Sequence, residues 1–255
     1  MIRLIVSDID KTLLKDGEKS LEKRVIECVR QLYDNKIIFM VASGRPYTDI
    51  YTMFEEVTDK MVIVSCDGAM MADGDKIIVN PMNQSKSLSI IKAANELDMP
   101  VCVTSQTTTY LKRDNPEFYH MIDKNRNEKI TVIDDFSDIR EKFLKINIYN
   151  AKQDINKQNK VVTRAKDDFN VVYRSNEWIE LVAKGIDKGY ALRQYMMMNN
   201  IDASEVMAFG DNCNDISMLK IAKESYGVLN ATEDVKSIVN YLTDDVIDTI
   251  KARVL

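Results

Sequence analysis

The sequence contains little histidine or cysteine, and neither residue is arranged as a catalytic or metal-binding group. His120 is the only histidine among 255 residues, which argues against a catalytic scheme based on partnered histidines. The four cysteines lie far apart and form no C-x-x-C pair: Cys28, Cys66, Cys102 and Cys213. We therefore expect reduced thiols rather than a disulfide framework or a zinc site.

Long apolar runs and an excess of positive charge are also missing. No run approaches the roughly 18 apolar residues that span a bilayer, and no basic segment precedes an apolar stretch near residue 1. The formal net charge of −5 argues against a general nucleic-acid binder. We expect a cytoplasmic protein that has no membrane or nucleic-acid partner and is a monomer or weak homodimer.

What the sequence does contain is an alternation of short apolar runs and amphipathic segments. The runs Ile2–Val6, Lys36–Val41, Met61–Ser65 and Val206–Phe209 are typical of buried parallel strands. Between the first two, apolar residues at helical spacing predict a helix from Leu21 to about Tyr33, with Ser20 as its N-cap. Such an alternation indicates an α/β fold with a mostly parallel sheet.

A second unit interrupts this pattern. Residues 84–187 alternate helices with short strands of their own, which predicts an inserted α/β domain. Glycine is scarce, with eight in the chain, so Gly185 and Gly189 stand out as boundary markers. We expect a core domain of residues 1–83 and 188–255 and an inserted domain of residues 84–187.

Polar side chains follow the predicted strands or begin the predicted helices at four places. These are Asp8 with Asp10, Ser43 with Gly44, Lys188, and Asp211 with Asn214 and Asp215. Each group alone could serve as a turn or a helix cap. Because ligands of open α/β sheets gather beyond the carboxyl ends of the strands, we expect the groups to converge. Clustered carboxylates need a cation, and Mg²⁺ prefers such oxygen ligands.

Four ordered motifs carry a resemblance to a known family. The motifs are D-I-D-K-T (residues 8–12), S-G-R-P (43–46), D-K-G-Y-A-L (187–192) and G-D-N-C-N-D (210–215). They resemble the haloacid dehalogenase superfamily and, within it, the Cof-type (class IIB capped) phosphatases. The resemblance implies a doubly wound, Rossmann-like core with an inserted α/β cap that covers the site and contacts the leaving group.

The resemblance also implies a role for each group. Asp8 would be the nucleophile that forms an aspartyl-phosphate, and Asp10 would be the general acid and base. The ligands of Mg²⁺ would be Asp8, Asp10 through its backbone carbonyl, and Asp211. The phosphate would be bound by Ser43, Gly44, Lys188 and Asn214. Thr12 and Asp215 would support the site.

The chain departs from the Cof pattern at Asp67, where these phosphatases usually have asparagine. We expect an extra carboxylate that faces the mouth of the site and either disfavours highly anionic substrates or pairs with a cation of the cap. Several cap residues are candidates for contacting the leaving group: Lys112, Arg113, Arg174, Ser175, Trp178 and Glu180. Packing is the favoured interpretation for Trp178.

The sequence thus predicts a Mg²⁺-dependent phosphatase of a small phosphorylated metabolite. Sugar phosphates are the leading substrates, and flavin mononucleotide and pyridoxal phosphate come next. Three alternatives remain open: a phosphomutase of the same superfamily, a non-catalytic sugar-phosphate-binding regulator and a response-regulator receiver. A receiver usually has about half this length and carries its phospho-acceptor after a middle strand.

Overall fold

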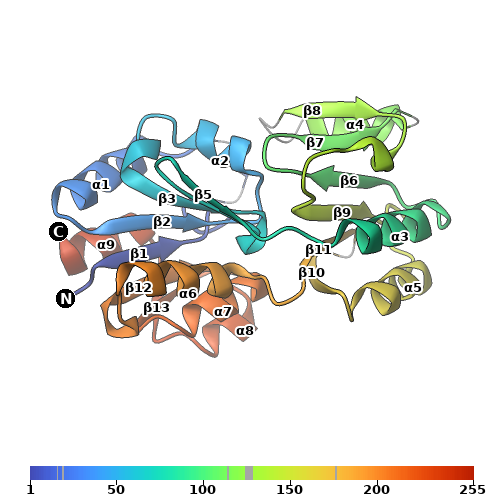
Figure 1. The fold of residues 1–255 in the computed structure, drawn as a ribbon. Helices are drawn as coiled ribbons and strands as arrows, with labels where there is room; N and C mark the ends of the chain where they lie inside the picture. The colour runs from blue at the N-terminus through green and yellow to red at the C-terminus, as the bar shows by residue number, and fades with distance from the viewer. Residues whose placement is uncertain (16, 19, 114, 124–128, 176) are drawn as a thin grey trace. The chain divides into compact units, whose positions relative to one another are not determined.

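The chain forms two compact units, shown in the computed structural model of Figure 1. The structure describes residues 1–255 except 16, 19, 114, 124–128 and 176. The core unit comprises residues 1–44, 50–78 and 187–255, and the inserted unit comprises residues 45–49 and 79–186. The inserted unit therefore begins at residue 79 and ends at residue 186, whereas the sequence predicted a start at 84 and an end at 187. The segment 45–49, which also belongs to this unit, was not predicted.

An eight-stranded sheet organises the core unit, in the order β14-β13-β12-β1-β2-β3-β4-β5. Its parallel strands are β1 (Leu4–Ser7), β2 (Ile38–Ala42), β3 (Met61–Ser65), β12 (Val206–Gly210), β13 (Glu224–Val228) and β14 (Tyr241–Thr243). The hairpin of β4 (Met70–Asp73) and β5 (Lys76–Val79) completes the sheet, with β4 antiparallel to β3. The predicted mostly parallel sheet is confirmed.

The connections of this sheet run in opposite directions from the central strand β1. The helices of the region are α1 (Lys23–Asp34), α2 (Tyr47–Met53), α6 (Lys188–Asn199), α7 (Ile216–Leu219), α8 (Glu233–Lys236) and α9 (Val246–Val254). Because parallel crossovers are right-handed, α1 covers one face of the sheet while α6, α7 and α8 cover the other. The carboxyl end of β1 is therefore a topological switch point, where such folds bind ligands.

The start of α1 differs from the prediction. The first helical residue is Lys23, and the N-cap is Glu22, which makes no side-chain capping hydrogen bond. Ser20 is therefore not the N-cap. The buried residues of the helix have helical spacing and form the face that packs against the sheet: Val25, Ile26, Cys28, Val29 and Leu32. No described helix combines the length and hydropathy that a bilayer-spanning segment needs.

The inserted unit has a sheet of its own, in the order β10-β11-β9-β6-β7-β8. The strands are β6 (Val101–Thr104), β7 (Thr109–Lys112), β8 (Ile130–Ile133), β9 (Lys145–Tyr149), β10 (Phe169–Ser175) and β11 (Trp178–Ala183). All neighbours are antiparallel except β7 and β8. The helices are α3 (Gln84–Asn95), α4 (Pro116–Asp123) and α5 (Ile155–Ala165).

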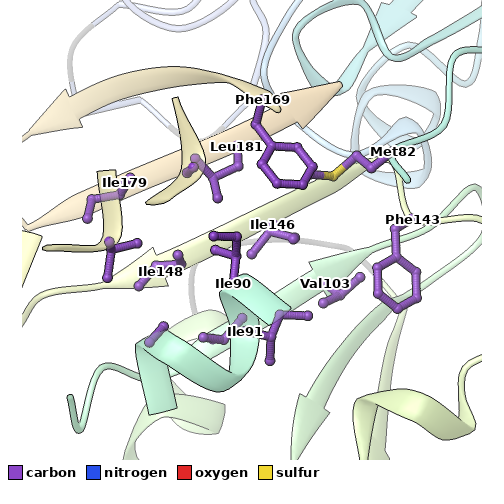
Figure 2. Packing of buried hydrophobic residues seen from close by; sticks show 14 of the residues in the cluster. Met82, Ile90, Ile91, Val103, Phe143, Ile146, Ile148, Phe169, Ile179 and Leu181 are labelled. Atoms are coloured by element: carbon purple, nitrogen blue, oxygen red, sulfur yellow. The ribbon is translucent and has the colours of Figure 1, made fainter. Parts of the chain in front are cut away.

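One face of this second sheet forms the hydrophobic core of the inserted unit. Figure 2 shows Ile90 and Ile91 of α3 packed toward Ile146 and Ile148 of β9. Because successive side chains of a strand point to opposite faces, Lys145 of β9 lies on the other face. A smaller apolar cluster, which includes Phe118 and Ile122 of α4, packs on that other face.

Candidate active site

Asp8 directly follows β1 and is held in the sheet by its own backbone. Its N–H donates to the carbonyl of Phe209 at the end of β12, with an N···O distance of 3.0 Å. The Asp8 carboxylate is consequently buried, with 5% of the residue exposed. Burial raises the pKa of both Asp8 and Asp211, and the negative charge of nearby Asp10 adds to the rise. The backbone then turns back, and the N–H groups of Thr12 and Leu14 both donate to the carbonyl of Ile9.

Lys188 connects two carboxylates of the core unit. It is the first residue of α6, after the N-cap Asp187, and only 1% of it is exposed. Its Nζ lies 2.6 Å from Oδ1 of Asp8 and 2.6 Å from Oδ1 of Asp215. Burial alone would lower the pKa of Lys188, but the negative charges of Asp215, Asp8 and Asp67 outweigh it and raise that pKa. The side chain is therefore a fixed cation within the site.

Asp215 uses both carboxylate oxygens to hold its neighbours. While Oδ1 binds Lys188, Oδ2 accepts the backbone N–H groups of Asp211 and Asn212 at 2.9 and 3.1 Å. A capping box between Asn212 and Asp215 gives the turn this shape. A side chain at Gly210 would lie 2.6 Å from the Cβ of Asp215, so this close approach requires glycine.

Three carboxylates gather where a cation would fit. Asp8, Asp211 and Asp215 each offer one oxygen, and these oxygens lie within 4.8 Å of one another. Burial, followed by the charge of Asp215, raises the pKa of Asp211 to about 6. Burial also raises the pKa of Asp8, although the charge of Lys188 opposes it. Hard oxygen donors with uncompensated charge are the environment that Mg²⁺ binds.

The segment after β2 lies at the same edge of the sheet. Ser43 is fully buried, its N–H donates to the carbonyl of Val64, and its carbonyl accepts the N–H of Asp67. Gly44 is buried beside it. The β1–β2 register pairs Ser7 with Val41, so Ser43 comes just beyond the same strand ends as Asp8. A phosphate-binding role for Ser43 and Gly44 stays a prediction.

The supporting role of Thr12 also stays a prediction. The residue is 8% exposed, and its Oγ1 is buried without a hydrogen-bond partner among the described residues. An unsatisfied buried hydroxyl is unusual enough to call for an explanation.

Asp67 is buried beside Asn214. Only 2% of it is exposed, and its Oδ1 accepts the Nδ2 of Asn214 at 3.0 Å. The expectation that this carboxylate disfavours highly anionic substrates or pairs with a cation of the cap stays a prediction. Asp67 does follow β3, so the pattern of an acid after a strand offered a signal for its place, although not for its partner.

The cap residues singled out from the sequence have varied surroundings. Trp178 packs with Tyr149 and Phe118, at ring-centroid distances of 4.8 and 6.0 Å, so the packing interpretation is confirmed. Glu180 forms a buried ion pair with Lys145, with an N···O distance of 2.6 Å. Of the other four, Lys112 ends β7 and is half-buried, and Arg113 is exposed and pairs with Asp134. The side chains of Arg174 and Ser175 lie outside the described residues.

Known proteins resemble the chain along almost its whole length. A family model described as haloacid dehalogenase-like hydrolase matches residues 5–249. The Escherichia coli 5-amino-6-(5-phospho-D-ribitylamino)uracil phosphatase YbjI is 26% identical over 251 residues, which cover 94% of this chain and 90% of the relative. The phosphatase YitU of Bacillus subtilis, named for the same substrate, is 24% identical over 252 residues, with coverages of 94% and 91%.

A solved structure supports the fold. The HAD subclass IIB sugar phosphatase BT4131 superimposes with a TM-score of 0.84 over 98% of each chain, at 19% sequence identity. At that identity, the likeness concerns the arrangement of the elements and leaves the chemistry to be argued from the residues.

Proposed function

Because the chain belongs to the haloacid dehalogenase-like hydrolase family, we propose that it is a Mg²⁺-dependent phosphatase acting through an aspartyl-phosphate on Asp8. The membership confirms the predicted family, and relatives named as phosphatases confirm the predicted class of phosphoric monoester hydrolase. One observation carries the proposal. A buried lysine lies 2.6 Å from each of two carboxylates, one of which is Asp8, at the switch point of the sheet.

In the first step, Asp8 attacks the phosphorus of the substrate. Since Oδ1 of Asp8 is bound to Lys188, the other carboxylate oxygen is the nucleophile. The bond between phosphorus and the ester oxygen breaks, and Asp10 gives its proton to the departing alkoxide. In the second step, Asp10 takes a proton from water, which attacks the phosphorus and releases inorganic phosphate and the Asp8 carboxylate.

Cationic and N–H groups neutralise the transferring phosphoryl group. Its equatorial oxygens carry the charge that the protein must stabilise, and Lys188 supplies a fixed positive charge beside Asp8. We assign the remaining phosphate contacts to Ser43, the backbone N–H of Gly44, and Asn214.

The side chains of Asp8 and Asp211, with the backbone carbonyl of Asp10, would hold the Mg²⁺ ion. When bound, the ion neutralises charge so that an anionic nucleophile can approach an anionic phosphate. Asp215 orients the site instead of binding the ion in this scheme, because Lys188 and two backbone N–H groups already occupy its oxygens.

For the substrate, we propose a monophosphate of a sugar or sugar alcohol. The relatives YbjI and YitU are named for a phosphorylated ribityl compound, and BT4131 is named a sugar phosphatase. The first compounds to assay are therefore 5-amino-6-(5-phospho-D-ribitylamino)uracil and hexose phosphates, followed by flavin mononucleotide and pyridoxal phosphate. A monomer or weak homodimer remains our prediction for the assembly.

The test compares wild type with Asp8→Asn in Mg²⁺-dependent hydrolysis of p-nitrophenyl phosphate. We expect the variant to be at least about a thousandfold slower, because an amide is a poor nucleophile. A wild-type reaction quenched in acid should leave radiolabelled phosphate on Asp8. Asp73→Asn is the matched control, because Asp73 ends β4, outside the proposed site, and accepts a long hydrogen bond of 3.4 Å from Tyr195. Equal rates for wild type and Asp8→Asn would refute the assignment of Asp8 as the nucleophile.

A further inference from the structure

The turn after β3 adopts a backbone conformation that most residues avoid. Cys66, Asp67 and Gly68 form a 3₁₀ turn, and their φ angles are 50°, 53° and 100°. Two successive non-glycine residues in the left-handed region are unfavourable and persist only where the surroundings hold them. At Gly68, an added Cβ would lie 2.2 Å from the carbonyl oxygen of Asp187, the residue before Lys188. The backbone of the turn is therefore packed closely against the start of α6.

This turn places the carboxylate of Asp67 against Asn214. The Asp67 N–H donates to the carbonyl of Ser43, and its Oδ1 accepts the Nδ2 of Asn214 at 3.0 Å. Asn214 belongs to the 3₁₀ turn Cys213–Asp215, whose last residue binds Lys188. Through its backbone and its side chain, this one buried residue thus connects segments that follow three different strands.

Asp67 has no place in the proposed metal site or in the chemical steps. Within the described residues, the acidic groups that gather closely enough for a cation are Asp8, Asp211 and Asp215. A carboxylate can only accept hydrogen bonds, so Asn214 must turn its NH₂ group toward Asp67. One N–H of that NH₂ group is then used, and the second is available in a fixed direction. A neutral amide at position 67 could accept or donate, and it would not impose this orientation.

We propose that Asp67 is a positioning residue that fixes the amide of Asn214 as a donor to the phosphoryl group. The proposal rests on the proposed function, since it assigns Asp67 a part in binding the same phosphate. Asn214 contacts the phosphate, and Asp67 acts on the phosphate through Asn214. The effect of a change at Asp67 on phosphate affinity should therefore be much smaller when Asn214 is absent.

The experiment is a double-mutant cycle with Asp67→Ala and Asn214→Ala. The readouts are kcat and KM for p-nitrophenyl phosphate and the affinity for inorganic phosphate. A hydrogen bond to a charged group corresponds to about tenfold in affinity, so each single variant should raise KM and weaken phosphate binding by about that factor. We expect kcat to change by less than about threefold, and the double variant should match Asn214→Ala alone. Additive losses, or an unchanged KM for Asp67→Ala, would overturn the proposal.

Two further variants separate positioning from folding. Asp67→Asn retains an acceptor and tolerates the left-handed backbone, so its KM should lie between those of wild type and Asp67→Ala. If Asp67→Ala does not fold, the cycle is run with Asp67→Asn and decides in the same way. Asp98→Ala is the matched control, because Asp98 also has a positive φ of 55° and its side chain is 94% exposed. It should leave KM unchanged.

Failure of this inference differs from failure of the proposed function. If wild type turns over with Mg²⁺ and Asp8→Asn does not, the cycle alone decides the role of Asp67. If wild type shows no turnover, the proposed function fails. The double-mutant cycle, measured as the affinity for inorganic phosphate, then still shows whether Asp67 acts through Asn214.

Discussion

The Nζ of Lys188 lies 2.6 Å from Oδ1 of Asp8, although 180 residues separate the two in sequence. The whole inserted unit lies between them in the chain, while both residues belong to the core unit. The same amine binds Asp215, so one cation offsets two buried carboxylates. Removal of Lys188 would leave both carboxylates without this cation, which makes its contribution measurable.

Replacement of Lys188 by methionine should impair both stability and turnover. Methionine has a similar length but no charge, so Asp8 and Asp215 would remain buried without their cation. Loss of one member of a buried ion pair costs about 3–5 kcal/mol in the free energy of unfolding. We expect kcat/KM to fall at least about a hundredfold. Urea denaturation and steady-state kinetics measure the two effects. Lys220→Met is the control, because Lys220 is exposed; equal effects of the two substitutions would contradict the assignment.

The stability of the metal-free protein should depend on the ionisation of Asp211. Its pKa in the folded protein is about 6, above the ordinary value of 3.8. Between these values the folded state keeps a proton that the unfolded chain releases, so the free energy of unfolding falls as the pH rises through this window. The raised pKa of Asp8 acts in the same direction. In EDTA, Tm should therefore be lower at about pH 7.5 than at about pH 5 because of these groups.

Mg²⁺ should reverse this loss, since its ligands must be deprotonated. We expect saturating Mg²⁺ to raise Tm by about 5 °C at neutral pH and by less near pH 5. Asp211→Asn should be more stable than wild type in EDTA at neutral pH and should respond less to Mg²⁺. The control Asp202→Asn changes a carboxylate at a surface turn and should keep the wild-type response. An undiminished Mg²⁺ response in Asp211→Asn would contradict its assignment as a ligand.

The site residues that the sequence predicted stand directly after a strand or at the start of a helix. Asp8 and Asp211 follow continuous apolar runs, and these runs are strands in the structure. Lys188 begins a helix whose cap, Asp187, is a typical capping residue. Where a residue follows directly from a regular element, periodicity and capping preferences locate it.

The contacts that the sequence did not reveal depend on irregular backbone or on long-range pairing. Asp67 meets Asn214 because its turn has three successive positive φ angles, and sequence preferences indicate that only for glycine. Lys145 stands at the first position of a strand, where a lysine is usually solvated. Its burial beside Glu180 follows from the pairing of β9 with β11.

Two glycines with positive φ allow the close approach at the 66–68 turn to be tested. An alanine at Gly68 would clash with the carbonyl of Asp187, whereas Gly74 has no atom within 4 Å of the added Cβ. We expect Gly68→Ala to lower the free energy of unfolding by about 2–4 kcal/mol, against about 1 kcal/mol for Gly74→Ala. Because Asp187 precedes Lys188, only Gly68→Ala should reduce kcat/KM. Equal stability losses in urea titrations would show that the backbone relaxes around the clash.

The buried ion pair of the inserted unit gives a final prediction. The side chains of Lys145 and Glu180 are 1% and 2% exposed, and their charged atoms lie 2.6 Å apart. Lys145→Met alone would leave the Glu180 carboxylate buried without its cation, at a cost of about 3–5 kcal/mol in the free energy of unfolding. The double variant Lys145→Met/Glu180→Leu removes both charges and should recover most of that loss, because a buried pair contributes little beyond an apolar pair of similar volume.

The surface pair Lys236–Glu233 supplies the matched control for this cycle. Its side chains are 30% and 90% exposed, so Lys236→Met should change the free energy of unfolding by less than about 1 kcal/mol. Urea denaturation of wild type, Lys145→Met, Glu180→Leu, the double variant and Lys236→Met separates the possibilities. If the loss in the double variant equals the sum of the losses in the single variants, the two side chains do not stabilise each other and the prediction is wrong. Recovery in the double variant instead shows that the cost of Lys145→Met arises from the loss of the cation beside the buried carboxylate of Glu180.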